Sequence, residues 1–311
     1  MTAAPDYGRI IDAETWAFIR RTGEFYPPDA VELSIADQRR VYDDMCRAFH
    51  QDYPDGVEVG DHSANGVPVR VYSAGHPTVN VVYFHGGGFV VGGLDSHDDV
   101  CAELHQQTGY RVISVDYRLA PEHKHPAAFE DSWTATQWVA ETFEGPLVLA
   151  GDSAGGNLAA AVAHHARGRQ DRIIGQVLIY PGLGGESDSG SYVEHANAPL
   201  LTRAELEFYA TIRCDGAVPT EDPTFAPLQD SDFRKLPPTV VFAAECDPIR
   251  DSGRIYCARL KQAGVRSEWV LEPGLVHGYL RARTSVTRAR ESFDRIALAI
   301  EALGQGIWSY D

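Results

Sequence analysis

The chain of 311 residues is poor in basic side chains and lacks any long apolar segment. It has 27 Lys and Arg against 44 Asp and Glu, and a formal net charge of −17. This excess of negative charge argues against nucleic acid and anionic membranes as partners. No apolar run is long enough to cross a bilayer, and we find no internal repeat or low-complexity tract.

Cysteine is also scarce. The five cysteines are odd in number and show no paired spacing, which fits a reducing compartment better than a disulfide framework. The segment Met1–Arg9 lacks the charged and then apolar pattern of a secretion signal. We therefore expect a cytoplasmic protein.

Two glycine-rich segments, each at the end of an apolar run, are the strongest signal present. His85–Gly88 (HGGG) follows the run Val79–Phe84, and Gly151–Gly156 (GDSAGG) follows Leu147–Ala150. Chance gives about 0.14 copies of G-x-S-x-G per chain of this composition, but roughly 0.01 copies of HGGG. Neither segment continues into the Gly-Lys-Ser/Thr of a phosphate-binding loop, so a different chemistry is indicated.

The second segment has the features of a nucleophile elbow, a sharp turn that carries a serine between a strand and a helix. The alanine-rich stretch Ala154–Ala166 contains no proline and favours a helix. Gly151 and Gly155 flank the motif, where side chains would collide in so tight a turn. Together with Asp152, they predict Ser153 as the nucleophile of an acyl-transfer hydrolase with an α/β-hydrolase fold.

The first segment predicts an oxyanion hole, the set of N–H donors that stabilises negative charge on the carbonyl oxygen. Gly87 and Gly88 have no Cβ, so their backbone can approach a substrate closely. Ala154, directly after the serine, supplies a further N–H group. His85 and Gly86 complete the motif that supports this loop.

The base is expected late in the chain, because the triad of this fold runs in the order serine, acid, histidine. His277 follows a strand predicted at Glu268–Leu271 and a turn predicted at Glu272–Gly274. His195 also lies in a predicted loop, but no late strand precedes it. We therefore predict His277 as the base.

The acid should follow the preceding strand, predicted at Thr239–Ala244. Three carboxylates, Glu245, Asp247 and Asp251, come next. Pro248 cannot extend a strand and suits the start of a helix, which leaves the residue before it in a loop. We predict Asp247 as the acid, with Glu245 as the alternative.

These segments resemble the hormone-sensitive-lipase family of α/β-hydrolases (bacterial family IV), and within it the acetyl esterases with a GDSAGG elbow. The likeness runs from Val79 to Phe293 and includes HGGGF, GGLDSHD, DYRLAPE, GDSAGG, DP and HGY. It implies a carboxylesterase that prefers short C2–C4 acyl groups, uses neither metal nor organic cofactor, and is a possible homodimer. Tyr279 replaces a Phe of many members and is expected to adjust the pocket.

The alternation of strand-like and helix-like segments from Val79 onward predicts a mainly parallel sheet flanked by helices. An antiparallel hairpin should precede it, with strands at Val57–Asp61 and Pro68–Tyr72 around the Asn65-Gly66 turn. Residues 1–50 are predicted to form helices, and residues 184–226 interrupt the alternation of strands and helices. The resemblance implies that these two pieces form a helical cap over a catalytic core of residues 51–183 and 227–311.

Within the two predicted cap pieces, local patterns indicate specific helices. Val41, Met45 and Phe49 recur at a spacing of four and form one apolar stripe. Thr202–Glu205 is a capping box before a helix to about residue 213. The apolar residues around this box are expected to need burial; they are Leu200, Leu201, Leu206, Phe208 and Tyr209.

Other functions fit the same residues. An amidase or deacetylase would use the same triad and the same tetrahedral chemistry. A hormone-type receptor would keep the fold without catalysis, although such receptors need not keep a complete triad. His123 and His125 have no further His or Cys nearby in the sequence, so we expect no metal site there.

Overall fold

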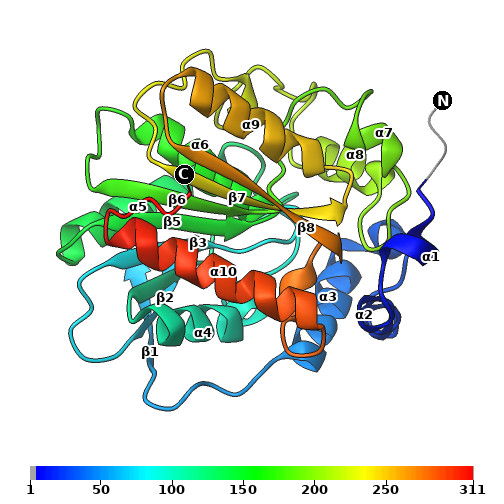
Figure 1. Cartoon of the computed structure of the whole chain (residues 1–311), viewed down its shortest axis with the longest axis horizontal. Coiled ribbons are helices and arrows are strands. Elements are labelled where there is room, and N and C mark those ends of the chain that lie inside the picture. Colours follow the sequence, from blue (N-terminus) through cyan, green and yellow to red (C-terminus); the bar gives the residue numbers. More distant parts are fainter. Residues whose placement is uncertain (1–4, 311) are drawn as a thin grey trace.

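The computed structural model describes residues 5–310 and centres on an eight-stranded sheet (Figure 1). The strand order is β1-β2-β4-β3-β5-β6-β7-β8. β1 and β2 form an antiparallel hairpin, β2 pairs antiparallel with β4, and all other neighbours are parallel. The strands are β1 (Glu58–Ala64), β2 (Val67–Ser73), β3 (Asn80–Phe84), β4 (Arg111–Val115), β5 (Leu147–Asp152), β6 (Ile173–Ile179), β7 (Thr239–Cys246) and β8 (Ser267–Val276).

Helices cover both faces of the sheet (Figure 1). They are α1 (Tyr7–Ile10), α2 (Ala13–Gly23), α3 (Ile35–Phe49), α4 (Asp98–Thr108), α5 (Ala127–Thr142), α6 (Ala154–Ala166), α7 (Ser191–Glu194), α8 (Arg203–Ile212), α9 (Arg250–Gln262) and α10 (Thr287–Gly304). Short 3-10 turns occur at η1 (Ala30–Glu32), η2 (Leu94–His97), η3 (Pro227–Gln229) and η4 (Tyr279–Ala282). α4 and α10 pack on one face, and α5, α6 and α9 on the other. Because both faces are covered, the central strands are continuous apolar runs. The α/β-hydrolase fold and its hairpin are confirmed.

One predicted turn is wrong. Glu272–Gly274 lies inside β8, which continues to Val276 and leads directly to His277. β8 is the last strand in the sheet order, so Pro273 can lack an N–H group without breaking a ladder on that side. The strand is irregular here, with a register shift against β7 between Ala244 and Cys246.

The two predicted cap segments contact each other beside the carboxyl ends of the strands (Figure 1). We use "cap" for residues 5–50 and 184–226; residues 1–4 of the predicted segment lie outside the described residues. The Tyr7 hydroxyl lies 3.0 Å from His195 Nδ1, and the hydroxyls of Tyr26 and Tyr209 lie 3.4 Å apart. Segments that lie 183 and 188 residues apart in the sequence are therefore in contact.

The local patterns of the cap are found where they were predicted, but the burial differs. Val41 and Met45 are buried, and the Thr202 capping box begins α8. Of the five apolar residues around that box, only Leu201 is fully buried. Leu200, Leu206 and Tyr209 are half-buried because they face a cavity, and Phe208 is half-buried outside it.

No helix in the described part of the chain is long and apolar enough to cross a membrane. The homodimer expected from the family likeness stays a prediction.

The segment after His277 is held to the core by a buried arginine. Arg283 follows η4 and is only 2% exposed. Its guanidinium forms ion pairs with Asp99, and with Glu103 at 2.7 Å, both on α4. A buried cation is stable only while its anions are present, so this contact fixes the loop between β8 and α10.

Replacing Arg283 tests this anchor. Arg283→Met should lower the free energy of unfolding by about 3–5 kcal/mol, because Asp99 would be left without its buried partner. Arg290→Met is the matched control, since Arg290 contacts Glu103 from a position with 35% of its side chain exposed. That variant should lose less than about 1 kcal/mol. Urea unfolding followed by circular dichroism measures both, and equal losses would contradict the anchoring role.

Candidate active site

Ser153 lies at a sharp turn between β5 and α6. Its backbone has φ 55° and ψ −114°, a conformation that L-residues rarely adopt. Its N–H donates to the carbonyl of Ile179 on the neighbouring β6 at 2.9 Å. A Cβ on Gly155 would overlap the Phe84 carbonyl oxygen, and one on Gly151 would lie 2.5 Å from the Gly155 backbone. The two glycines are therefore required sterically, as the motif predicts.

Three predicted side chains, far apart in the sequence, form a chain of short hydrogen bonds. His277 Nε2 lies 2.8 Å from Ser153 Oγ, and His277 Nδ1 lies 2.7 Å from Asp247 Oδ2. Asp247 is fully buried and also accepts the Ile249 N–H at 3.0 Å. In the tautomer that satisfies both ring contacts, Nδ1–H donates to Asp247 and Nε2 accepts from the serine hydroxyl.

The other candidates have different partners. Glu245 accepts the N–H of Gly274 at 2.7 Å, which stabilises the irregular part of β8. Asp251 accepts the N–H of Ser191 at 3.1 Å, at the start of α7. His195 lies between Tyr7 and an arginine of α9. None of these three side chains forms a hydrogen bond or an ion pair with Ser153 or His277.

Three backbone N–H groups are free beside Ser153. The residues Gly87, Gly88 and Ala154 line the same cavity as Ser153 and His277. In the described part of the chain, their N–H groups donate to no other residue. Gly87 and Gly88 have φ values of +130° and +59°, which a glycine adopts without strain.

Asp152 connects this loop to the elbow. Its Oδ1 accepts the Gly86 N–H and the Tyr83 hydroxyl, both at 2.9 Å. Burial by itself raises the pKa of this carboxyl, but His97, Arg281 and the Tyr83 hydroxyl outweigh burial and hold the pKa well below its usual range. Asp152 is therefore a buried carboxylate that fixes the position of Gly86.

His85 also stabilises the HGGG loop, from within the core. It is fully buried, and its ring stacks on Tyr117 at 4.3 Å between centroids. Its Nδ1 lies 2.8 Å from the Gly86 carbonyl oxygen, and the Tyr117 hydroxyl donates to the His85 carbonyl at 2.7 Å. Burial, together with His97, lowers the pKa of His85 to about 4, so the ring is neutral at pH 7.

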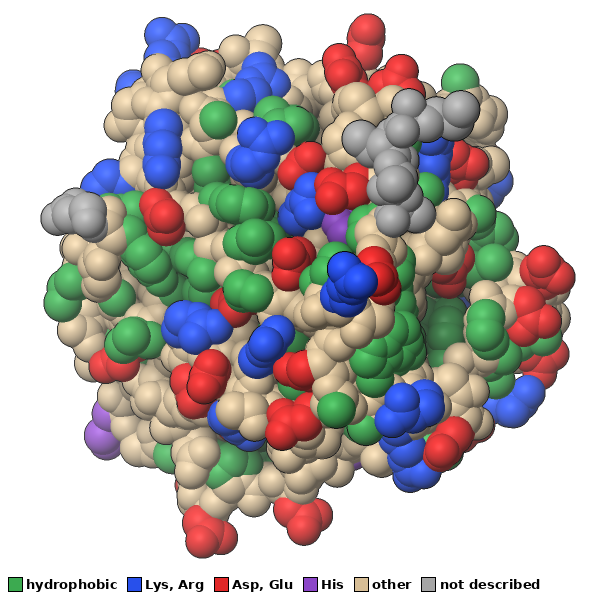
Figure 2. Space-filling model, turned by 45° about the vertical axis from the view of Figure 1, so that its right-hand side comes forward, with side chains coloured by type: hydrophobic (Ala, Val, Ile, Leu, Met, Phe, Trp, Pro, Cys, Tyr) green, Lys and Arg blue, Asp and Glu red, His purple; other side chains and the backbone are tan. Residues whose placement is uncertain are grey.

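The site opens into a cavity of about 700 Å³ between core and cap. The side of the molecule with the N-terminal helices shows hydrophobic side chains gathered around a recess (Figure 2). Tyr209 of α8 packs so closely on Gly88 that a Cβ there would lie 2.6 Å from its ring. The cap thus forms a wall directly above the loop of free N–H groups.

Several residues around the cavity have no signal in the sequence. Tyr180 tilts against the His277 ring at 4.8 Å, although it follows an ordinary apolar strand. Tyr209 lies on α8 and Arg213 directly follows it, and no local pattern fixes the orientation of that helix. Tyr279 does not itself line the cavity: its hydroxyl lies 2.8 Å from Ser292 Oγ on α10, and its ring packs on Tyr180, which does. That Tyr279 adjusts the pocket stays a prediction.

Comparisons with known proteins identify the family of this chain. The family model described as alpha/beta hydrolase fold matches residues 81–281. Carboxylesterase NlhH of Mycobacterium tuberculosis is 38% identical over 259 residues, which covers 78% of this chain and 80% of the relative. Ethyl acetate hydrolase of Pseudomonas putida is 32% identical over 306 residues, which covers 92% and 94%.

Among solved structures, the hyperthermophilic esterase from the archaeon Pyrobaculum calidifontis superposes with a TM-score of 0.84 at 34% identity. The alignment covers 92% of this chain and 97% of that one. The matched region contains the elbow, the free N–H groups and the His277 loop. This chain belongs to the hormone-sensitive-lipase family of α/β-hydrolases.

Proposed function

We propose that the protein is a serine carboxylesterase that hydrolyses short-chain esters through an acyl-serine intermediate. The observation that carries this function is the contact of Ser153, His277 and Asp247 beside three free N–H groups, inside a cavity. A base within 2.8 Å of a serine hydroxyl can take its proton, and a buried carboxylate can hold that base in one tautomer.

In the first half of the reaction, Ser153 Oγ attacks the ester carbonyl carbon and gives its proton to His277 Nε2. The imidazolium then protonates the alcohol oxygen as the C–O bond breaks, and the alcohol leaves. In the second half, water gives a proton to His277 and attacks the acyl-serine. The proton returns to Ser153, and the carboxylic acid leaves. Asp247 stabilises the imidazolium in both halves.

The carbonyl oxygen becomes negative in each tetrahedral intermediate. The N–H groups of Gly87, Gly88 and Ala154 are placed to donate to it, at no cost in reorganisation because the loop is already folded. Asp152 contributes indirectly: it binds the Gly86 N–H and so positions the two glycines that follow. We regard it as a positioning residue.

The short-chain preference is supported by the relative named ethyl acetate hydrolase, which is similar over 92% of this chain. A cavity of about 700 Å³ holds both parts of a small ester. Acyl length must therefore be selected by the walls next to Ser153, where Tyr209 packs against Gly88. Such walls discriminate by about 1–3 kcal/mol per methylene.

An acyl-length series on p-nitrophenyl esters tests the proposal. Values of kcat/KM for C2–C4 esters should exceed those for C8 by about tenfold or more. Ser153→Ala should lower kcat on the order of 10⁴-fold or more, and Ser189→Ala, an exposed serine, should have no effect. A kcat/KM that keeps rising to C8 would refute the chain-length part.

Two further measurements distinguish the esterase from a receptor without catalysis and from an amidase. An organophosphate should label the wild-type protein once, at Ser153, whereas a receptor without catalysis would leave this serine unlabelled. p-Nitrophenyl acetate should be hydrolysed and p-nitroacetanilide should not; faster cleavage of the anilide would make the protein an amidase.

Removing the Asp152 carboxylate tests the positioning of the loop. Asp152→Ala should lower kcat by about 10–100-fold with KM changed less than about threefold, because the oxyanion donors lose alignment. Asp152→Asn keeps one oxygen and should recover part of the loss. Asp95→Ala, with 94% of its side chain exposed, is the control. A change in KM alone would show that Asp152 acts on substrate binding instead.

A further inference from the structure

A buried arginine without an anionic partner, Arg213, lines both the catalytic cavity and a second, small pocket. Arg213 is only 7% exposed, and its guanidinium carbon lies 3.5 Å from the ring centre of Phe89 and 3.8 Å from that of Phe225. Within residues 5–310, its side chain makes no hydrogen bond and no ion pair. The two rings cover much of the guanidinium, and its N–H edge is the part left to meet a partner.

The other cations of the cavity are different. Arg203 pairs with Glu207 at 2.9 Å, and Arg281 donates to the Tyr42 hydroxyl. The acids of the cavity are also engaged. Glu205 accepts from Thr202 in the capping box at 2.7 Å, and Asp152 is used by the oxyanion loop. Within the described chain, Arg281 forms no ion pair and its Nε has no hydrogen-bond partner, but it keeps the contact with Tyr42. Among the described cations that line the cavity, Arg213 is the one whose side chain has neither a hydrogen bond nor an ion pair.

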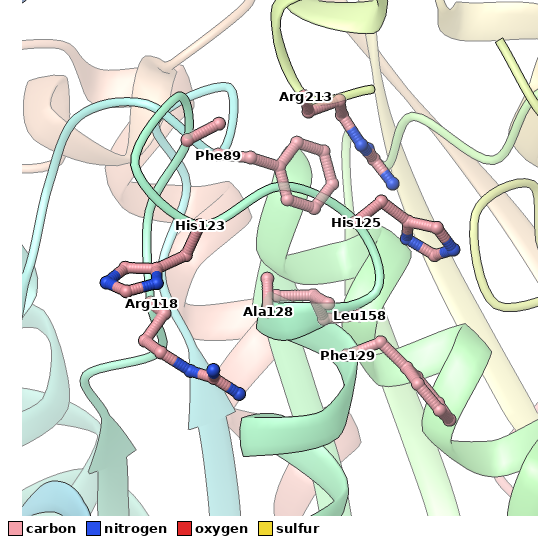
Figure 3. A pocket seen from close by; sticks show the side chains of 9 residues that line it. Phe89, Arg118, His123, His125, Ala128, Phe129, Leu158 and Arg213 are labelled. Carbon is pink, nitrogen blue, oxygen red and sulfur yellow. The ribbon is translucent and has the colours of Figure 1, made fainter. Parts of the chain in front are cut away.

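Arg213 also lines a second, small pocket, which adds no negative charge (Figure 3). Arg213 reaches past the ring of Phe89 toward His125 (Figure 3). The basic residues that line this pocket are Arg118, His123, His125 and Arg213, and no Asp or Glu lines it. The nearby Asp222 bonds His125 Nε2 at 3.0 Å, not Arg213.

Keeping this cation buried costs stability, because a charged group loses its hydration in the interior. Burial lowers the pKa of Arg213 to about 9, so the group still carries its charge at pH 7. An incoming anion could accept hydrogen bonds from the guanidinium N–H groups, because no described protein group accepts from them.

Arg213 and Ser153 line the same cavity, and the two rings around the guanidinium are connected to the elements that carry Ser153 and the N–H donors. Phe89 directly follows Gly88, whose N–H faces the site. The carbonyl of Phe225 accepts a hydrogen bond at 2.9 Å from Asn157, which lies one helical turn after Ser153. Both rings that hold the guanidinium are therefore joined to the elements that carry the reaction.

We propose that Arg213 binds a carboxylate of the substrate, so that the preferred substrates are short esters with a second, free carboxylate a few bonds from the reacting carbonyl. This proposal rests on the esterase function. The carboxylate can belong to the acyl part, as in a monoester of a small dicarboxylic acid, or to the alcohol part, as in an acylated hydroxy acid. Arg213 is then a specificity-determining residue.

Matched ester pairs distinguish these two sources in a pH-stat assay. Monomethyl succinate and methyl 4-oxopentanoate differ only in a carboxylate on the acyl side. Acetoxyacetate and acetoxyacetone differ in the same way on the alcohol side. In at least one pair, wild-type kcat/KM should favour the carboxylate ester by about tenfold or more, and that pair identifies the part of the ester that Arg213 holds.

Arg213→Gln should lower this preference to about threefold or less, mainly through KM of the carboxylate ester, and Arg213→Lys should retain part of it. Arg118→Gln is the control, because Arg118 lines only the small pocket and pairs with Asp131 at 2.8 Å. It should keep the wild-type preference. Thermal unfolding checks that each variant is folded.

A binding measurement separates this proposal from the esterase function. Calorimetry with the Ser153→Ala protein should detect binding of succinate. Succinamide should bind at least tenfold more weakly. Succinate should be weakened by the same factor in the Ser153→Ala, Arg213→Gln double variant. If Arg213→Gln lowered kcat/KM equally for both members of an ester pair, Arg213 would have a structural role and the proposal would be overturned. Binding of chloride or inorganic phosphate as tightly as succinate would also overturn it. If p-nitrophenyl acetate is not hydrolysed, the esterase function fails, and the succinate result still decides the role of Arg213.

Discussion

The site depends on the close approach of two backbone segments: the end of β3 and the first turn of α6. Gly155 lies so near the Phe84 carbonyl that no side chain fits between them. This contact puts the elbow serine beside the HGGG loop, which leaves the sheet directly after Phe84. Nucleophile and N–H donors therefore come from adjacent parallel strands, β3 and β5, and their separation is set by the strand spacing. Asp152 then fixes the position of the HGGG loop relative to the elbow by accepting the Gly86 N–H.

The same contact explains why the sequence was so informative about the core of the site. The elbow and the HGGG loop are local motifs, and each glycine in them has a steric reason that can be read without coordinates. The order of the triad along the chain follows from the order of parallel strands, so a single late histidine after a strand was enough to indicate His277. Asp247 was favoured over Glu245 by one local feature, the proline that follows it. The two glycine motifs and the Asp247-Pro248 pair are local features, whereas His277 follows from the order of the fold along the chain.

What the sequence could not show depends on contacts between distant segments. The strand through Pro273 was interpreted as a turn, because only the position of β8 at the edge of the sheet makes a proline acceptable there. The apolar side chains around the Thr202 capping box are predicted to need burial, but α8 has no fully buried residue, because it faces the cavity. Tyr209 and Arg213 line the cavity, and Tyr26, in the turn after α2, contacts the Tyr209 hydroxyl there. No periodicity in either segment encodes that pairing.

The charge of the whole molecule and the charge of the cavity act over different distances. A net charge of −17 disfavours the approach of an anionic ester, but salt at physiological strength screens such fields beyond about 8 Å. Inside the cavity, screening is weak and the interaction of a guanidinium with a carboxylate is stronger than in water. Arg213 can therefore select among esters that have already entered, while the acidic surface acts on their rate of arrival. Selection of this kind changes how tightly a substrate is held near Ser153 and leaves the triad chemistry itself unaltered.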